Sequence, residues 1–319
     1  MGDRRDIIFA FMPGQGSAEA ESLLLVKSIR QFGGRWRNNP IWVMIPNRIE
    51  TLSPLTRQSL EAFEARLLPF EVKAETLAFL YGGKVVAAAA AETLAEDQTD
   101  LLVWMDSDTV FLKEPAEFFL KDGENLGCCP VMLKNISSLS EEPLNPFWEK
   151  VFKGCRTLPE NIFSLETLVD AVRIRAQFNA GMLAVRPEKA LLRSWRDDFL
   201  RLYQLPHWEP YFLENFLYKI FIHQAILAGT ILARLKPSEI HYFSRRVNYP
   251  LFLHDRYPLE HRPPGLNGLT SFRYDAYTFF KNTNWLAILP SDEPLKLWLN
   301  RNIPPLEKQR VESPGIFLT

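Results

Sequence analysis

The sequence predicts an α/β protein built on a Rossmann-like, mostly parallel sheet flanked by helices, with an irregular C-terminal half. In the first half, short apolar runs typical of buried strands alternate with longer helical stretches, which is the pattern of a doubly wound sheet. One of these runs, 101–105, ends in Asp106-Ser107-Asp108, and such sheets bind ligands beyond the carboxyl ends of their strands. With 319 residues and 47% hydrophobic content, the chain is long enough to bury a substantial core.

Local signals place the strands and helices of the first half in order. Ser17 can cap the first helix, and Gly33-Gly34 can end it. Ser53-Pro54 opens the second helix, and an alanine-rich run of high helix propensity forms the third. The expected order is a strand at 7–11, a helix at 17–32, a strand at 41–45, a helix at 53–67, a strand at 71–76, a helix at 84–94 and a strand at 101–105.

The second half is less regular. Residues 135–167 are rich in Pro, Ser and Asn, which predicts a loop-rich insertion. The other expected elements are a short helix at 115–120, strands at 126–133 and 178–185, and helices at 187–203 and 214–227. We expect a single domain over 1–290, made of the halves 1–112 and 113–290, and a proline-containing tail over 291–319 that packs on the surface.

Composition and charge argue against several classes of protein. A net charge of -1, with Lys and Arg scattered along the chain, argues against a nucleic-acid partner. Cys128 and Cys129 are adjacent and Cys155 is isolated, so we expect reduced thiols and a cytoplasmic location. The apolar run at 7–11 is too short for a signal peptide. Polar residues interrupt the apolar region 212–235, which favours a buried core helix over a transmembrane segment.

The carboxylates of Asp106 and Asp108 are the strongest chemical signal in the chain. Alternate residues of a strand point to the same side, so both side chains can converge if the strand continues through Ser107. Two carboxylates so close together repel each other, and a divalent cation such as Mg²⁺ or Mn²⁺ relieves that repulsion. The same tripeptide also occurs as a helix cap or a turn, so the spacing alone leaves both interpretations open.

Four segments, in order along the chain, carry a resemblance to a known family. They are WMDSDTV at 104–110, FNAGMLAVRP at 178–187, HQAIL at 223–227 and NYPLFLH at 248–254. Together they resemble the GT-A glycosyltransferases, which use nucleotide-diphosphosugar donors, and above all the glycogenin-like members of glycosyltransferase family 8. The first contains the metal-binding DxD signature, and the second resembles the F-N-[SA]-G strand of that family. The third is similar to its D-Q-x-x-[LF] helix, and the fourth is placed like the late loop that supplies a metal-ligating histidine.

This likeness runs in order over roughly residues 6–258. It implies a GT-A type fold in which 1–112 is the nucleotide-binding half and 113–290 binds the sugar and the acceptor. It also implies that Asp106 and Asp108 hold Mn²⁺ or Mg²⁺, which bridges the two phosphates of the donor and neutralises the charge that develops as the anomeric C–O bond breaks.

The resemblance assigns further residues to this site. His254 would complete the metal ligands, with His241 as a competitor on the same segment. Lys84 would point toward the diphosphate, although a solvated lysine is the alternative. The residues expected to contact the nucleotide-sugar donor, which by resemblance is a UDP-sugar, are Met12, Lys84, Ser107 and Gly181.

Asn179 and Gln224 are the expected catalytic residues. By resemblance, Asn179 hydrogen-bonds the donor sugar and Gln224 lies near its reacting face. His223 stands where the family usually has aspartate, and a buried core histidine is the alternative for it. The likeness favours retention at the anomeric carbon, whereas inversion would need a general base, for which Asp255 or Asp275 could serve.

The sequence therefore predicts a metal-dependent glycosyltransferase of the hexosyltransferase type. It would move a sugar from a nucleotide-diphosphate donor to a carbohydrate, lipid or protein acceptor that the sequence does not define. One alternative is a non-catalytic descendant of the fold that binds a sugar or a protein. The other is a sugar nucleotidyltransferase, whose N-terminal glycine-rich signature carries basic residues that the turn at 13–16 lacks.

Overall fold

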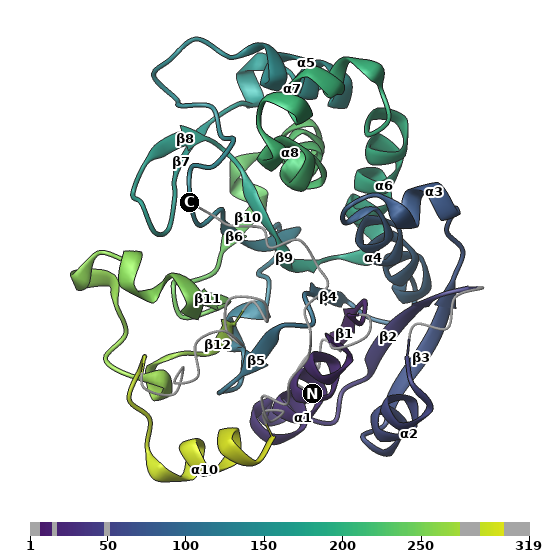
Figure 1. Ribbon diagram of the computed structural model, residues 1–319, viewed down its shortest axis with the longest axis vertical. Coiled ribbons are helices and arrows are strands. Elements are labelled where there is room, and N and C mark those ends of the chain that lie inside the picture. Colours follow the sequence, from purple (N-terminus) through teal and green to yellow (C-terminus); the bar gives the residue numbers. More distant parts are fainter. Residues whose placement is uncertain (1–6, 15–17, 48–51, 275–287, 303–319) are drawn as a thin grey trace.

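The computed structural model describes residues 7–14, 18–47, 52–274 and 288–302, and it confirms the expected α/β architecture (Figure 1). Within these residues, a seven-stranded sheet runs in the order β10-β6-β9-β4-β1-β2-β3. In this sheet only β9 is antiparallel to its neighbours, β4 and β6. The strands are β1 (Ile7–Phe11), β2 (Ile41–Pro46), β3 (Ala65–Phe70), β4 (Leu101–Met105), β6 (Leu126–Pro130), β9 (Phe178–Val185) and β10 (Ile240–Tyr242).

Helices cover both faces of this sheet, and each face has its own apolar core. The helices are α1 (Glu19–Phe32), α2 (Pro54–Ala62), α3 (Ala74–Ala78), α4 (Gly82–Ala95), α5 (Pro146–Cys155), α6 (Leu191–Leu202), α7 (Glu209–Glu214), α8 (Phe216–Arg234) and α10 (Glu293–Asn302). Alternate residues of β4 enter opposite cores: Val103 packs on the side of α1 and α2, and Trp104 packs on the side of α4, α6 and α8. This burial on both faces explains why β4 is an uninterrupted apolar run.

A second, three-stranded sheet lies at the carboxyl end of β4. It contains β11 (Tyr249–Pro250), β12 (Ser271–Arg273) and β5 (Thr109–Phe111), in that order. Because β5 begins directly after the aspartate pair and is antiparallel to β12, a segment from late in the chain meets the end of β4. Through this small sheet, residues from late in the chain lie beside Asp106 and Asp108.

Several expected elements differ from the structure. The third strand is 65–70 and not 71–76, because Glu64 turns the chain with φ 56° after α2 and the following residues then pair with β2. The insertion at 135–167 is less irregular than expected, since it contains α5, which Asn145 caps by accepting a hydrogen bond from the Trp148 N–H. The tail contains α10, and Ser17, the expected cap of α1, lies outside the described residues.

The helix α8 is the one described element long and apolar enough to cross a membrane, and 67% of its most apolar window is buried in the protein. It packs against α5, α6 and β9, so it is a core helix of this fold. The cysteines Cys128, Cys129 and Cys155 are free and buried. Burial raises the pKa of the Cys129 and Cys155 thiols to about 12, which keeps both in the neutral form.

Candidate active site

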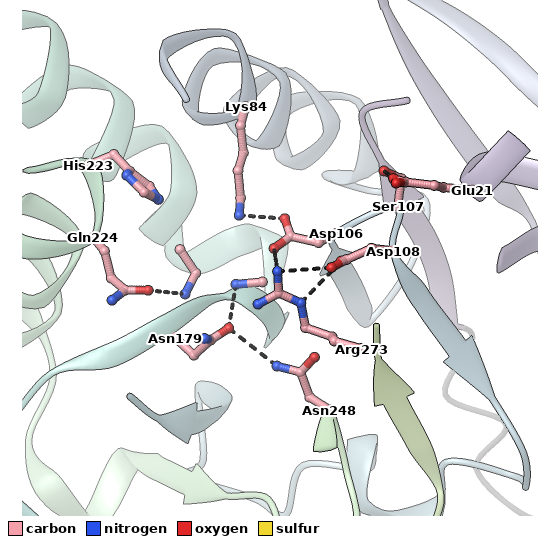
Figure 2. A network of polar contacts seen from close by, with 12 residues as sticks. Glu21, Lys84, Asp106, Ser107, Asp108, Asn179, His223, Gln224, Asn248 and Arg273 are labelled. Carbon is pink, nitrogen blue, oxygen red and sulfur yellow. Dashed lines mark hydrogen bonds and ion pairs between the residues drawn. The ribbon is translucent and has the colours of Figure 1, made fainter. Parts of the chain in front are cut away.

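The aspartate pair lies in a turn at the carboxyl end of β4. The N–H of Asp106 donates to the Gly181 carbonyl at 2.9 Å, and the N–H of Thr109 donates to the Asp106 carbonyl at 3.3 Å. The chain therefore turns at Ser107 and does not continue as a strand, which is the second of the two local conformations that the tripeptide left open. The turn nevertheless brings the carboxylates of Asp106 and Asp108 to the same point (Figure 2).

Two cations face these carboxylates. Lys84, in the first turn of α4, places its Nζ 2.5 Å from Oδ1 of Asp106. Arg273, at the end of β12, places its Nη2 3.3 Å from Oδ2 of Asp106 and 3.2 Å from Oδ2 of Asp108. The Nε of Arg273 donates to Oδ1 of Asp108 at 3.1 Å. The four side chains form a compact cluster of two positive and two negative charges, in which Arg273 contacts both carboxylates (Figure 2).

The electrostatics of the cluster follow from its burial. Burial by itself raises the pKa of Asp106, but the charges of Lys84 and Arg273 outweigh that effect and hold the pKa below its usual value. Burial lowers the pKa of Lys84, and the charge of Asp106 counteracts this. Asp106 and Lys84 therefore each depend on neighbouring charges to remain ionised.

A second group of polar side chains lies beside the cluster, on β9 and α8. The amide oxygen of Asn179 accepts hydrogen bonds from the Gly181 N–H at 2.8 Å and from Nδ2 of Asn248 at 3.3 Å. The amide oxygen of Gln224 accepts from the Ala180 N–H at 3.2 Å. These contacts hold Asn179 on β9 and bind Gln224 from α8 to the same stretch of that strand (Figure 2).

His223 lies on the same side as Lys84 (Figure 2). Its Nδ1 lies 2.8 Å from the Ile220 carbonyl, and its ring packs 4.5 Å from the ring of Tyr81. Burial and the nearby charge of Lys84 lower its pKa to about 3, so the imidazole is neutral at pH 7. Since the carbonyl requires a proton on Nδ1, Nε2 is a hydrogen-bond acceptor.

Tyr81, whose ring packs on His223, has a backbone φ of 60°, which is a strained conformation for an aromatic residue.

The chain matches the model of a known protein family. Residues 9–222 match the model of the Rhodobacterales glycosyltransferase domain, which is two thirds of the sequence. The chain belongs to this family. It is therefore a glycosyltransferase, as the sequence predicted.

The chain is also similar to a solved structure, the apo form of mouse xyloside xylosyltransferase 1. The two share 13% sequence identity with a TM-score of 0.43, and the match covers 86% of this chain and 98% of the other. No curated protein matches the sequence significantly. The narrower likeness to family 8 remains a prediction.

Two further residues expected at the donor lie around this glycosyltransferase's cluster. The hydroxyl of Ser107 donates to Oε2 of Glu21 on α1 at 3.0 Å, so it is bound to the protein itself. Met12 follows β1 and lies against Gly83, next to Lys84: a Cβ on Gly83 would be 3.2 Å from its Cε. The ends of β1 and β4 thus both border the cluster.

The structure does not bring the expected histidine to the aspartates. The Nδ1 of His254 is hydrogen-bonded to the Tyr249 hydroxyl at 2.8 Å, and its competitor His241 lies 3.5 Å from Glu124. Within the part of the chain that the structure describes, no three His, Cys, Asp or Glu side chains are arranged to hold a metal ion. Asp275, an expected alternative base, lies outside that part.

Arg273 is a residue of the site that the sequence did not predict. Nothing in its neighbourhood, TSFRYD at 270–275, marks the arginine as functional, because only the pairing of β12 with β5 brings it to the aspartates. Asn248 belongs to the segment at 248–254 that carries part of the family resemblance. Its contact with Asn179 could not be predicted from the sequence, because it depends on the tertiary structure. Its amide oxygen is buried without a hydrogen-bond partner among the described residues.

Proposed function

We propose that this glycosyltransferase uses a nucleotide-diphosphate sugar, with a UDP-sugar as the expected donor, and binds its diphosphate at the carboxyl end of β4. The cluster of Lys84 and Arg273 around the aspartate pair is the observation that carries this proposal. It lies where the strand order reverses: β1 has β4 on one side and β2 on the other. Open α/β sheets bind nucleotides at such switch points.

The position of Lys84 supports the placement of the diphosphate. It lies in the first turn of α4, a helix of 14 residues whose N-terminal amides carry partial positive charge. Its side chain is only 11% exposed, so its charge acts in a medium of low dielectric constant. Such a cation stabilises the negative charge that develops on the departing diphosphate more strongly than one in open water.

The sugar would lie over the polar group on β9 and α8. Asn179 and Gln224 are held there by backbone and side-chain hydrogen bonds, so their positions are fixed before the sugar arrives. His223 offers a neutral nitrogen acceptor, which suits a sugar hydroxyl better than a charged imidazolium would. These residues would orient the anomeric carbon toward the acceptor.

We propose that transfer retains the configuration of the anomeric carbon. The bond from this carbon to the diphosphate oxygen breaks, and its electron pair stays on that oxygen. The acceptor oxygen bonds to the carbon on the same face, and its proton passes to the departing phosphate. Asp106 is a poor alternative base, because its pKa is held low by two cations. NMR of the first product would test this, since an inverted anomer contradicts it.

Titration calorimetry with UDP, and with GDP for comparison, tests the donor site. We expect UDP to bind the wild-type protein and Lys84→Gln to weaken binding at least tenfold, because a charge-assisted hydrogen bond to phosphate is lost. Lys296→Gln is the matched control, as Lys296 is 50% exposed on α10 and pairs with Glu293. Equal UDP affinity in Lys84→Gln and wild type would contradict the placement of the diphosphate.

Turnover must be measured as well. A radiolabelled UDP-sugar series, assayed for hydrolysis and for transfer to simple glycoside acceptors, would identify the donor sugar. A protein that binds UDP but releases none from any UDP-sugar would favour the non-catalytic alternative.

A further inference from the structure

A guanidinium occupies the place where a divalent cation would bind between the two carboxylates. Arg273 ends β12, and the antiparallel register pairs it with Thr109, the residue after Asp108. The N–H of Tyr274 also donates to the Asp108 carbonyl at 3.3 Å. The backbone therefore fixes Arg273 beside the aspartate turn.

The side chain of Arg273 is held as firmly as its backbone. Its Nε and Nη2 both face the Asp108 carboxylate, and Nη2 also faces Asp106. A Cβ on Gly181 would lie 3.2 Å from its Nη1, so β9 confines the third nitrogen. The side chains of Arg273, Asp106 and Asp108 are 19%, 20% and 11% exposed, which limits screening of these contacts by water.

The residues present do not fit a divalent cation in this arrangement. The pair offers two carboxylates, and no third acidic or histidine ligand joins them among the residues that the structure describes. A cation placed between Asp106 and Asp108 would also contact the positive charge of Arg273, which already neutralises them. His254, which by resemblance would be the metal-ligating histidine, instead bonds the Tyr249 hydroxyl, and Arg273 from β12 faces the carboxylates.

We propose that Arg273, together with Lys84, replaces the divalent cation, so that the donor diphosphate binds to protein cations and needs no metal. This rests on the proposed function, because it concerns how the same diphosphate is held. The two side chains carry two positive charges, as one Mg²⁺ or Mn²⁺ would. Asp106 and Asp108 then act as positioning residues that align both cations, and not as metal ligands.

Calorimetric titration with UDP in EDTA, and again with Mn²⁺ or Mg²⁺, tests the inference on the full chain. We expect the dissociation constants to agree within about twofold, because a bound metal would contribute far more than that. Binding that appears only with a metal would overturn this inference and leave the proposed function intact. If UDP fails to bind in either condition, the proposed function fails and the inference fails with it.

Two substitutions distinguish a diphosphate that is neutralised by a metal ion from one that is neutralised by Arg273 and Lys84. Asp106→Asn removes a metal ligand and leaves both cations, so we expect it to weaken UDP binding in EDTA by less than Arg273→Gln does. Arg273→Gln removes a cation and leaves both carboxylates, so we expect at least tenfold weaker binding in EDTA. The reverse result, loss in Asp106→Asn and no change in Arg273→Gln, would overturn the inference.

A third substitution has a readout that does not depend on UDP. Arg273→His replaces the guanidinium by an imidazole beside two carboxylates, which is a suitable ligand set for Mn²⁺. Electron paramagnetic resonance with Mn²⁺ alone should detect binding to this variant and none to the wild-type protein. Strong Mn²⁺ binding by the wild type would overturn the inference. Thermal unfolding of each variant checks that it is folded.

Discussion

Gly181 is the position where the smallest chemical change should disturb the site most. An alanine there would place its Cβ 2.5 Å from Oδ2 of Asp106 and 2.9 Å from Oδ1 of Asn179. Ordinary contact begins at 3.4 Å, so the Asp106 carboxylate would have to move by about 0.9 Å, the difference between 3.4 and 2.5 Å. This movement would break its 3.3 Å contact with Nη2 of Arg273.

The size of the effect follows from these contacts. Overpacking a well-packed site costs about 1–3 kcal/mol. Because Gly181 touches the ionic cluster on one side and Asn179 on the other, we expect most of this cost to appear in ligand binding. A loss of this size corresponds to roughly 5- to 150-fold weaker binding of UDP or its sugar. Global stability should fall only slightly, because alanine suits a strand as well as glycine does.

The assay is calorimetric titration with UDP, paired with thermal unfolding. Gly268→Ala is the matched control, since the nearest atoms to its Cβ, on Pro263 and Pro264, are at 3.7 Å. We expect the control to bind UDP as the wild type does. Unchanged UDP affinity in Gly181→Ala would refute the geometry of the cluster described above. A variant that no longer unfolds cooperatively would instead show that the cost falls on the fold.

Three other changes test the fold and the sugar side. Buried Glu92 accepts hydrogen bonds from the Leu192 and Arg193 N–H groups at the start of α6, and burial raises its pKa from 4.5 to about 7. Stability should therefore fall by roughly 3 kcal/mol as pH rises from 4.5 to 7, and Glu92→Gln should remove this slope in urea unfolding. Trp195→Ala should cost about 3–5 kcal/mol, measured in the same way, because Trp195 is fully buried and donates to the His223 carbonyl. His223→Phe should weaken binding of the UDP-sugar relative to UDP by about tenfold, and equal losses for both ligands would contradict a role at the sugar.

Local sequence patterns predicted the parts of the site that lie on single elements. The apolar run of β4 followed by an Asp-Ser-Asp turn, and the alanine-rich helix that begins near Lys84, are both visible in short windows. The strand of Asn179 and Gly181 was also predicted with its observed bounds, 178–185. Strands and helices can be predicted from such patterns because burial periodicity and helix propensity depend on residues that are close together in the sequence.

Other elements were missed where local signals compete. The helix expected to run to 67 ends at Ala62, and residues 65–70 pair with β2 as an edge strand. The sequence of this strand, ARLLPF, lacks clear alternation and contains Pro69, which an edge strand tolerates. The assignment depended on a partner strand more than 20 residues away, which periodicity cannot detect.

The sequence by itself determined that the chain is an α/β protein with two carboxylates at the end of a central strand, and motif order indicated a glycosyltransferase. Only the tertiary structure decided what faces those carboxylates. Arg273 lies 165 positions after Asp108 and reaches it because β12 pairs with β5, while His254 turns to the Tyr249 hydroxyl. Strand pairing across such a separation depends on the packing of the whole chain, so no local pattern reveals which cation lies beside the pair.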